Sequence, residues 1–546
     1  MPPDNEGSSV PARIDNGQST RVRRACDGCR IRKVKCDRTQ PCSQCNQHAI
    51  ACVTTPEPEK RKNIVRGRLV AQARGDLLVE AQKTPPSTHA DHHSSREFLA
   101  VSSPGNVSLS AAPRYIADFF RELMPQFEKF VYPFSPALSP DDILEAINKM
   151  NHSFEDAALV YAASSTTIFL TDSFGNVHGE AATTMHDLIL CSLEAQRQAD
   201  LQLDPRGRIN GERCVTNKRI ITNIFLEISM MAFKLLERSF SHLREAITLI
   251  QLKVTHDRNL SVEQDQHHSA FQRLYWEAYI HERFLTITSG FPSVLPPLKS
   301  GIPVLDPSMP LHIHVGFNRL IHLFLILDDT FLAQWDGREE GFANITNHWI
   351  ENKQIQLDQD EIDAAEDENE LHRCGHPGLT EHQRADLFIT RLWLRTLLWQ
   401  IALSKGFLRS VTGRNSHEAL SLQFPALRLS TQLKSIVSRL DSIASIGTQG
   451  SGIIQKLFEV TSTIADVLAL SPVNFLDDGT SVNLSSHIDD FLFIVKFFFN
   501  FERIYDRQRA YLLEKVDILR QSHSSSGFLD LPSPGSYLAQ VATPLE

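Results

Sequence analysis

The stretch RIITNIFLEISMMAFKLLERSFSHLREAITLIQLKV, residues 219–254, decides the fold class of most of the chain. Its apolar side chains recur every three or four positions, at Ile220, Ile224, Ile228, Met231, Leu235, Leu243, Ile247 and Ile250. That period is typical of an amphipathic helix with one buried face. The length of the stretch predicts at least one pair of long helices.

The same helical period recurs along the rest of the chain, whereas the alternating pattern of a strand is scarce. Further helices are predicted over residues 115–127, 385–403, 429–446, 453–470 and 488–521. We therefore expect a mainly α fold, with a large all-helical domain over residues 112–521. The acidic run near 349–378 predicts a solvated loop within it, and residues 522–546, rich in Ser and Pro, predict a flexible tail.

Charge is distributed unevenly between the two ends of the chain. Residues 1–83 carry 16 Lys and Arg against 9 Asp and Glu, a net charge of +7, and the remainder carries 39 against 56, a net charge of −17. A basic head on an acidic body indicates two different partners, and a polyanion is the expected partner of the head. No run of eighteen apolar residues is present, so no membrane partner is expected.

The basic head divides by composition into three parts. Residues 1–20 are polar and rich in Gly, Pro, Ser and Asn, which predicts a disordered arm. Residues 21–55 contain six of the nine cysteines, and residues 56–111 form a linker that is first basic and then rich in Ser and Pro. The N-terminus lacks the apolar core of a secretory signal. We therefore expect a reducing compartment, in which thiols bind metal rather than form disulfides.

The six clustered cysteines repeat one half-motif twice, C-x2-C-x6-C, with five residues between the halves. They are Cys26, Cys29, Cys36, Cys42, Cys45 and Cys52. A C-x2-C pair brings two sulfurs to one ion from a tight turn or from the first turn of a helix. Two tetrahedral zinc ions need eight ligands, and six sulfurs suffice only if two of them bridge both ions. The pseudo-symmetry of the halves predicts two Zn²⁺ bridged by Cys26 and Cys42.

Cationic side chains accompany only the first half of the cysteine repeat. The first six-residue spacer, RIRKVK, holds four cations, whereas the second, NQHAIA, holds none. This asymmetry predicts that one flank faces DNA, with Arg32 and Lys33 nearest the bases and Arg30 and Lys35 on the phosphates. The predicted DNA-binding set is Arg24, Arg30, Arg32, Lys33, Lys35 and Arg38.

These residues resemble the fungal zinc binuclear cluster (Zn(2)-C6) family of transcription factors. The resemblance rests on RRACDGCRIRKVKCDRTQPCSQCNQHAIACV, including Lys33, the pair Cys36-Asp37 and Pro41. It implies two zinc ions bridged by Cys26 and Cys42, and a short helix whose C-terminal end reads CGG-type triplets. Members often bind paired triplets as dimers through a coiled coil after the linker, although no full heptad series follows the cysteines here.

A second resemblance lies in the body, over residues 242–254 and 271–297. These stretches are similar to the middle homology region of the same regulators, which carries an Arg-Arg-aromatic-Trp stretch, an acidic-Arg pair and a Gly-x-Pro turn. Gln272 replaces the first Arg, while Arg273, Trp276, Glu282, Arg283 and Pro292 remain. Trp276 and its aromatic neighbours are expected in the core, and Arg273 is a candidate for a buried ion pair with Glu282 or Arg283.

Together these features predict a nuclear, DNA-binding regulator of RNA polymerase II genes in a fungus, with double-stranded DNA, the transcription machinery and a second copy of the chain as partners. An activator of a metabolite biosynthetic gene cluster is preferred. Regulation of carbohydrate or carbon-source utilisation, or a zinc-dependent protein-protein adaptor, is the alternative. No phosphate loop, HExxH or nucleophile elbow is present, so an enzyme is not expected.

Overall fold

The computed structural model describes two stretches of the chain, a short one among the cysteines and a long helical one. The described residues are 36–37, 39, 42–47, 115–171, 180–201, 215–257, 265–336, 345–409, 417–439, 450–469, 484–501 and 504–524. By its internal contacts the chain divides into two compact units, Met1–Ile64 and Val65–Glu546. In the first unit the described residues hold one short helix, α2 (Ser43–Gln47).

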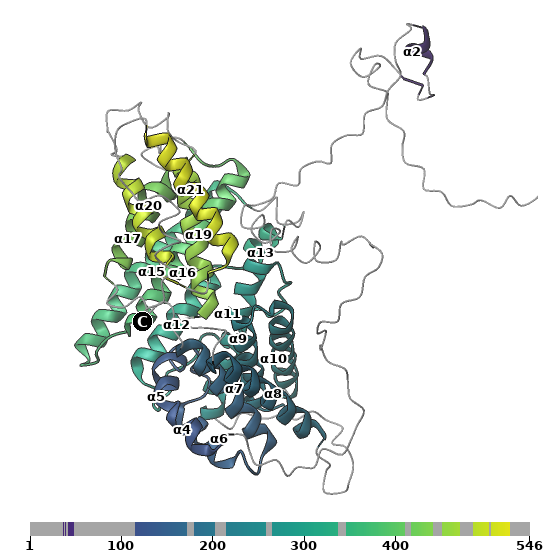
Figure 1. The fold of residues 1–546 in the computed structure, drawn as a ribbon, viewed down its shortest axis with the longest axis vertical. Coiled ribbons are helices and arrows are strands. Elements are labelled where there is room, and N and C mark those ends of the chain that lie inside the picture. The colour runs from purple at the N-terminus through teal and green to yellow at the C-terminus, as the bar shows by residue number, and fades with distance from the viewer. Residues whose placement is uncertain are drawn as a thin grey trace, which may run out of the picture. The chain divides into compact units, whose positions relative to one another are not determined.

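The second unit confirms the mainly helical fold. Its described residues contain no strand, only an isolated bridge between Arg409 and Ser421. Its first helices are α4 (Ala117–Glu122), α5 (Met124–Gln126), the π-helical turn η1 (Phe127–Val131), α6 (Pro140–Lys149), α7 (Phe154–Thr171), α8 (Glu180–Leu201), α9 (Asn217–Ala232) and α10 (Leu236–Asp257). Helices α7, α8, α9 and α10 pack as neighbours (Figure 1).

The second half of this unit forms another helical layer. It contains α15 (Asn347–Arg373), α16 (Glu381–Lys405), the turns η2 (Glu418–Leu420) and η3 (Pro425–Leu429), α17 (Ser430–Val437), α19 (Gly450–Ala469), α20 (Leu484–Phe498) and α21 (Asp506–Ser524). Helices α16, α19 and α21 pack in sequence, and α17 packs on α20. Between the halves lie α11 (Asp265–Ser289), α12 (Leu311–Leu325) and α13 (Asp329–Trp335).

The predicted helix pair over residues 219–254 is confirmed as α9 and α10. Thr216 begins α9 because its side chain accepts a hydrogen bond from the Arg219 N–H at 3.1 Å, which satisfies a donor that the helix itself leaves open. The chain reverses between the two helices at Lys234, whose φ of 58° is left-handed. Ile220, Ile224, Ile247 and Ile250 are buried, as their spacing predicts.

The predicted acidic loop is wrong over most of its length, because residues 347–373 form the 27-residue helix α15. Its carboxylates face arginines from two other helices. Arg391 on α16 contacts Asp360 at 2.6 Å, and Arg319 on α12 contacts Asp363 at 3.3 Å and also Asp367. These ion pairs offset the repulsion between neighbouring carboxylates, which is the feature that made the run resemble a solvated loop. Only the short turn after Arg373 leaves the helix.

Among the described residues of the second unit, buried apolar side chains from Phe120 to Leu519 form one hydrophobic core. Trp276 and Tyr279 of α11 are buried in it, as predicted. Their rings pack edge to face, with centroids 5.1 Å apart. None of the described helices is both long enough and apolar enough to cross a membrane.

The ion pair proposed for Arg273 has a different partner. Arg273 lies 3.3 Å from Asp306 rather than beside Glu282 or Arg283. Glu282 and Arg283 instead hold the turn after α11, where the backbone N–H groups of Val294 and Leu295 each donate to Glu282 at 2.9 Å.

Candidate metal centre

The candidate metal centre is built around the start of α2. Cys42 lies immediately before this helix and Cys45 lies in its first turn. The C-x2-C pair therefore stands where its spacing predicts, with both cysteines fully buried. The Cys45 N–H lies 3.4 Å from the Cys42 Sγ and donates to it. An N–H directed at sulfur favours the thiolate, which is the form that binds a metal ion.

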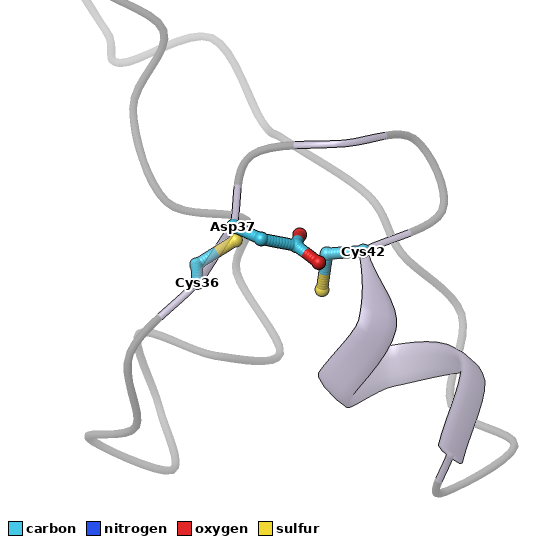
Figure 2. A group of neighbouring side chains, drawn as sticks. All are labelled: Cys36, Asp37 and Cys42. Atoms are coloured by element: carbon cyan, nitrogen blue, oxygen red, sulfur yellow. The ribbon is translucent and has the colours of Figure 1, made fainter.

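Cys36 comes to the same place from the preceding half of the repeat. Its Sγ, the Sγ of Cys42 and a carboxylate oxygen of Asp37 all lie within 4.8 Å of one another. Figure 2 shows the three side chains gathered in front of α2. Cys36 also packs against the small buried cluster that Cys42 and Cys45 form. The two halves of the cysteine repeat thus meet at one point, as a shared metal cluster requires.

Asp37 is engaged by hydrogen bonds from the loop that joins the two halves. Its carboxylate accepts from the Ser43 N–H at 2.9 Å, from the Thr39 N–H at 3.2 Å and from the Thr39 hydroxyl at 3.0 Å. Hydrogen bonds from Ser43, and then those from Thr39, lower the pKa of Asp37 to about 2. The side chain therefore ties the first residue of α2 to the segment that carries Cys36, next to the sulfurs (Figure 2).

Sequence reasoning noted Asp37 only as part of a resembling motif and missed this tie. The available signal was the Asp-x-Thr spacing of Asp37 and Thr39, because Asp side chains commonly accept from the backbone two residues later. The donor set fits zinc, since buried thiolates are its preferred ligands in closed structural sites. When bound, zinc supplies folding free energy to such a module.

Most of the predicted site residues lie outside the described residues. They are Cys26, Cys29 and Cys52 among the metal ligands, and Arg24, Arg30, Arg32, Lys33, Lys35 and Arg38 among the DNA contacts. Their roles stay predictions, as does the bridging role of Cys26 and Cys42. The predicted dimerising segment after the cysteines also lies outside the described residues.

Comparison with known families agrees with the cysteine geometry. Residues 24–62 match the fungal Zn(2)-Cys(6) binuclear cluster domain, which binds two zinc ions. This range overlaps the predicted module, residues 21–55.

Curated relatives match beyond the cysteine region. The "Probable sucrose utilization protein SUC1" of Candida albicans is 22% identical over 97% of this chain and 96% of that protein. The "Maltose fermentation regulatory protein MAL13" of Saccharomyces cerevisiae is 22% identical over 83% of this chain and 85% of that protein. The "Arabinolytic transcriptional activator araR" of Emericella nidulans is 37% identical over 15% of this chain and 10% of that protein.

Proposed function

We propose that the chain is a fungal Zn(2)-Cys(6) transcription regulator, which acts in the nucleus as an activator of RNA polymerase II genes. The zinc domain brings it to CGG-type triplets, and the acidic helical domain contacts the transcription machinery. The observation that carries this proposal is the meeting of Cys36 and Cys42 beside the buried Cys45 at the start of α2. A centre closed by all six thiolates would present a recognition segment and leave no coordination position for catalysis.

The assignment of DNA-contacting residues rests on the unequal charge of the two spacers in the cysteine module. Four cations lie in the spacer before Cys36 and none in the spacer after Cys45. Lysine or arginine on guanine O6 and N7 is the commonest specific contact in the major groove. Lys33 and Arg32 are therefore assigned to the bases, and Arg30 and Lys35 to the phosphates.

Carbon-source utilisation is the target class that the relatives favour. Two proteins whose names concern sucrose utilisation and maltose fermentation match over most of their own length. A biosynthetic gene cluster, the other pathway considered, gains no support from those names. Activation rather than repression is supported by the acidic body and by the short match to an arabinolytic activator.

The sharpest test is the affinity of the full zinc-loaded chain for duplexes with and without a CGG triplet. Lys33→Ala should reduce discrimination between the duplexes by about 1–3 kcal/mol, because it removes a base contact. Lys35→Ala is the matched control. It should weaken binding to both duplexes equally and lower the salt slope by about one, as expected of a phosphate contact.

Equal affinity of the zinc-loaded chain for both duplexes would contradict the proposal and favour a zinc-dependent adaptor. Duplexes with two triplets at varied spacing test the homodimer, since a dimer prefers one spacing. A reporter gene that falls when the chain is expressed would establish a repressor. Sequencing the DNA bound in cells grown on different sugars tests the pathway.

A further inference from the structure

The helical domain contains a partly open cavity of about 180 Å³ where its two halves meet. Its walls come from α7 and α9 of the first half, α16 and α19 of the second, and α11 and α12 between them. An engineered cavity of about 150 Å³ in another protein holds benzene, so this one accepts a compact, ring-sized molecule. Its apolar lining includes five phenylalanines, namely Phe134, Phe169, Phe284, Phe317 and Phe324.

Five ionisable groups line the same cavity, and four of them form two pairs. His281 Nδ1 lies 2.6 Å from a Glu227 carboxylate oxygen, and Lys456 Nζ lies 3.2 Å from Asp386. Burial lowers the pKa of His281, but the Glu227 carboxylate outweighs burial and raises the pKa above its ordinary value. Each of these two carboxylates therefore has a basic partner. The fifth group, Glu277, leaves one carboxylate beyond these two pairs.

Glu277 is almost completely buried, with 1% of its surface exposed. One of its carboxylate oxygens accepts from the Ser135 hydroxyl. The other, Oε2, has no hydrogen-bond donor among the described residues. An acceptor in that position loses the hydrogen bonds it would make in water. Burial raises the pKa of Glu277 to about 7, and neither the charge of His281 nor the Ser135 hydroxyl offsets the effect.

We propose that this cavity binds a compact amine, whose protonated nitrogen donates to Glu277 and whose apolar body packs among the phenylalanines. A cation offers Glu277 the basic partner that Glu227 and Asp386 already have, and its N–H supplies a donor to an oxygen that has none among the described residues. A sugar fits less well, because it would turn several hydroxyls toward phenylalanine side chains. This inference goes beyond DNA binding and does not depend on it.

Occupancy of the cavity links the two halves of the domain. Glu227 lies on α9, Glu277 on α11 and Lys456 on α19, so a bound molecule contacts both helical layers at once. A ligand that binds only the folded arrangement stabilises it by mass action. The domain is thereby equipped to report a small molecule to the rest of the regulator.

Benzylamine, benzyl alcohol and toluene form a suitable probe series, because they share a ring and differ in the polar group. Each is titrated calorimetrically into the full zinc-loaded chain at pH 7.5. Benzylamine should bind with a dissociation constant on the order of 1 mM, as expected of a ligand this small. Benzyl alcohol should bind at least about tenfold more weakly, since a charge-assisted hydrogen bond is stronger than a neutral one.

Two variants assign the binding to this cavity. Glu277→Gln should weaken benzylamine at least about tenfold and leave toluene unchanged, because the amide keeps the shape and removes the charge. Gly452→Leu should abolish binding of all three probes. A Cβ at Gly452 would meet only Phe284, at 3.7 Å, so the added side chain extends into the cavity. Replacing a helical glycine also favours the fold.

Glu194→Gln, on the exposed face of α8, is the matched control and should bind benzylamine like the wild type. The proposal is overturned if the wild type does not bind benzylamine, if benzyl alcohol binds as tightly, or if Gly452→Leu keeps its affinity. Because the readout is calorimetric and uses no DNA, its failure is distinguishable from a failure of DNA recognition.

Discussion

The cysteine module and the helical domain are held together by different forces. Among its described residues, the module has a buried cluster of only Cys42 and Cys45, with Cys36 packed against it. The helical domain has one continuous apolar core from Phe120 to Leu519. A segment as short as the module cannot bury enough apolar surface to fold alone, so metal binding takes the place of a core. The difference predicts opposite responses of the two regions to metal, mutation and pH.

Removing zinc should separate the two regions most sharply. Structural zinc contributes about 10–16 kcal/mol to the folding of small metal-binding modules. Excess 1,10-phenanthroline should therefore unfold residues 24–62 and leave the helical domain intact. Hydrogen exchange followed by mass spectrometry should show lost protection in peptides containing α2 and unchanged protection in α16.

Added zinc should restore the protection of α2, whereas magnesium, the control ion, should not. Protection of α2 that survives chelation would show that the module folds without metal. Loss of protection in α16 would show that the two regions are not independent.

Breaking the cluster around Glu282 should have the next largest effect, confined to the helical domain. Glu282 is completely buried and contacts Arg244 at 2.9 Å and Arg283 at 3.4 Å. Glu282→Ala removes the buried carboxylate partner of Arg283, leaves it the exposed Asp329 at 3.9 Å, and removes the acceptor of two backbone N–H groups. The free energy of unfolding by urea should fall by about 3–5 kcal/mol, with zinc content unchanged.

The exposed pair of Arg428 and Glu418 provides the control for this variant. Glu418→Ala should change the free energy of unfolding by less than about 1 kcal/mol, because solvent screens such pairs. All five tryptophans lie between Trp276 and Trp399. Tryptophan fluorescence therefore follows the unfolding of the helical domain alone. If both variants lowered the free energy of unfolding equally, the buried cluster around Glu282 would not stabilise the domain more than an exposed ion pair does.

The sequence predicts well those structural features that depend on residues close together along the chain. The period of 219–254 gives α9 and α10, and the spacing of Cys42 and Cys45 places them at the start of a short helix. Both signals are local, because they depend on positions three or four residues apart. The same holds for Trp276, whose helical spacing predicts its burial.

Contacts between distant segments could not be predicted in the same way. The acidic run of α15 resembles a loop until Arg319 and Arg391 come beside it from other helices. The partner of Arg273 is Asp306, which the sequence gives no reason to choose. Glu277 was not singled out either, although Glu277 and His281 stand four residues apart on one helix face. Only packing shows that this face closes a cavity.

The cysteine module and Glu277 of the helical domain should respond to pH in opposite directions, and this is the smallest of the expected effects. The module loses zinc as the pH falls, because protons compete for its thiolates. In the helical domain, burial raises the pKa of Glu277 from 4.5 to about 7. Between these values the folded state binds more protons than the unfolded state, so the contribution of Glu277 to stability falls as the pH rises.

The measurement is the free energy of unfolding of wild type and Glu277→Gln, followed by tryptophan fluorescence in urea at several pH values. Glutamine does not titrate, so the difference between the two proteins isolates Glu277. The wild type should lose up to about 3 kcal/mol relative to the variant as the pH rises from 4.5 to 7, and the difference should level off above 7. A difference that is flat, or that changes in favour of the wild type as the pH rises, would mean that Glu277 is ionised at little cost in the folded domain. The contrast in pH response between the two regions would then be lost.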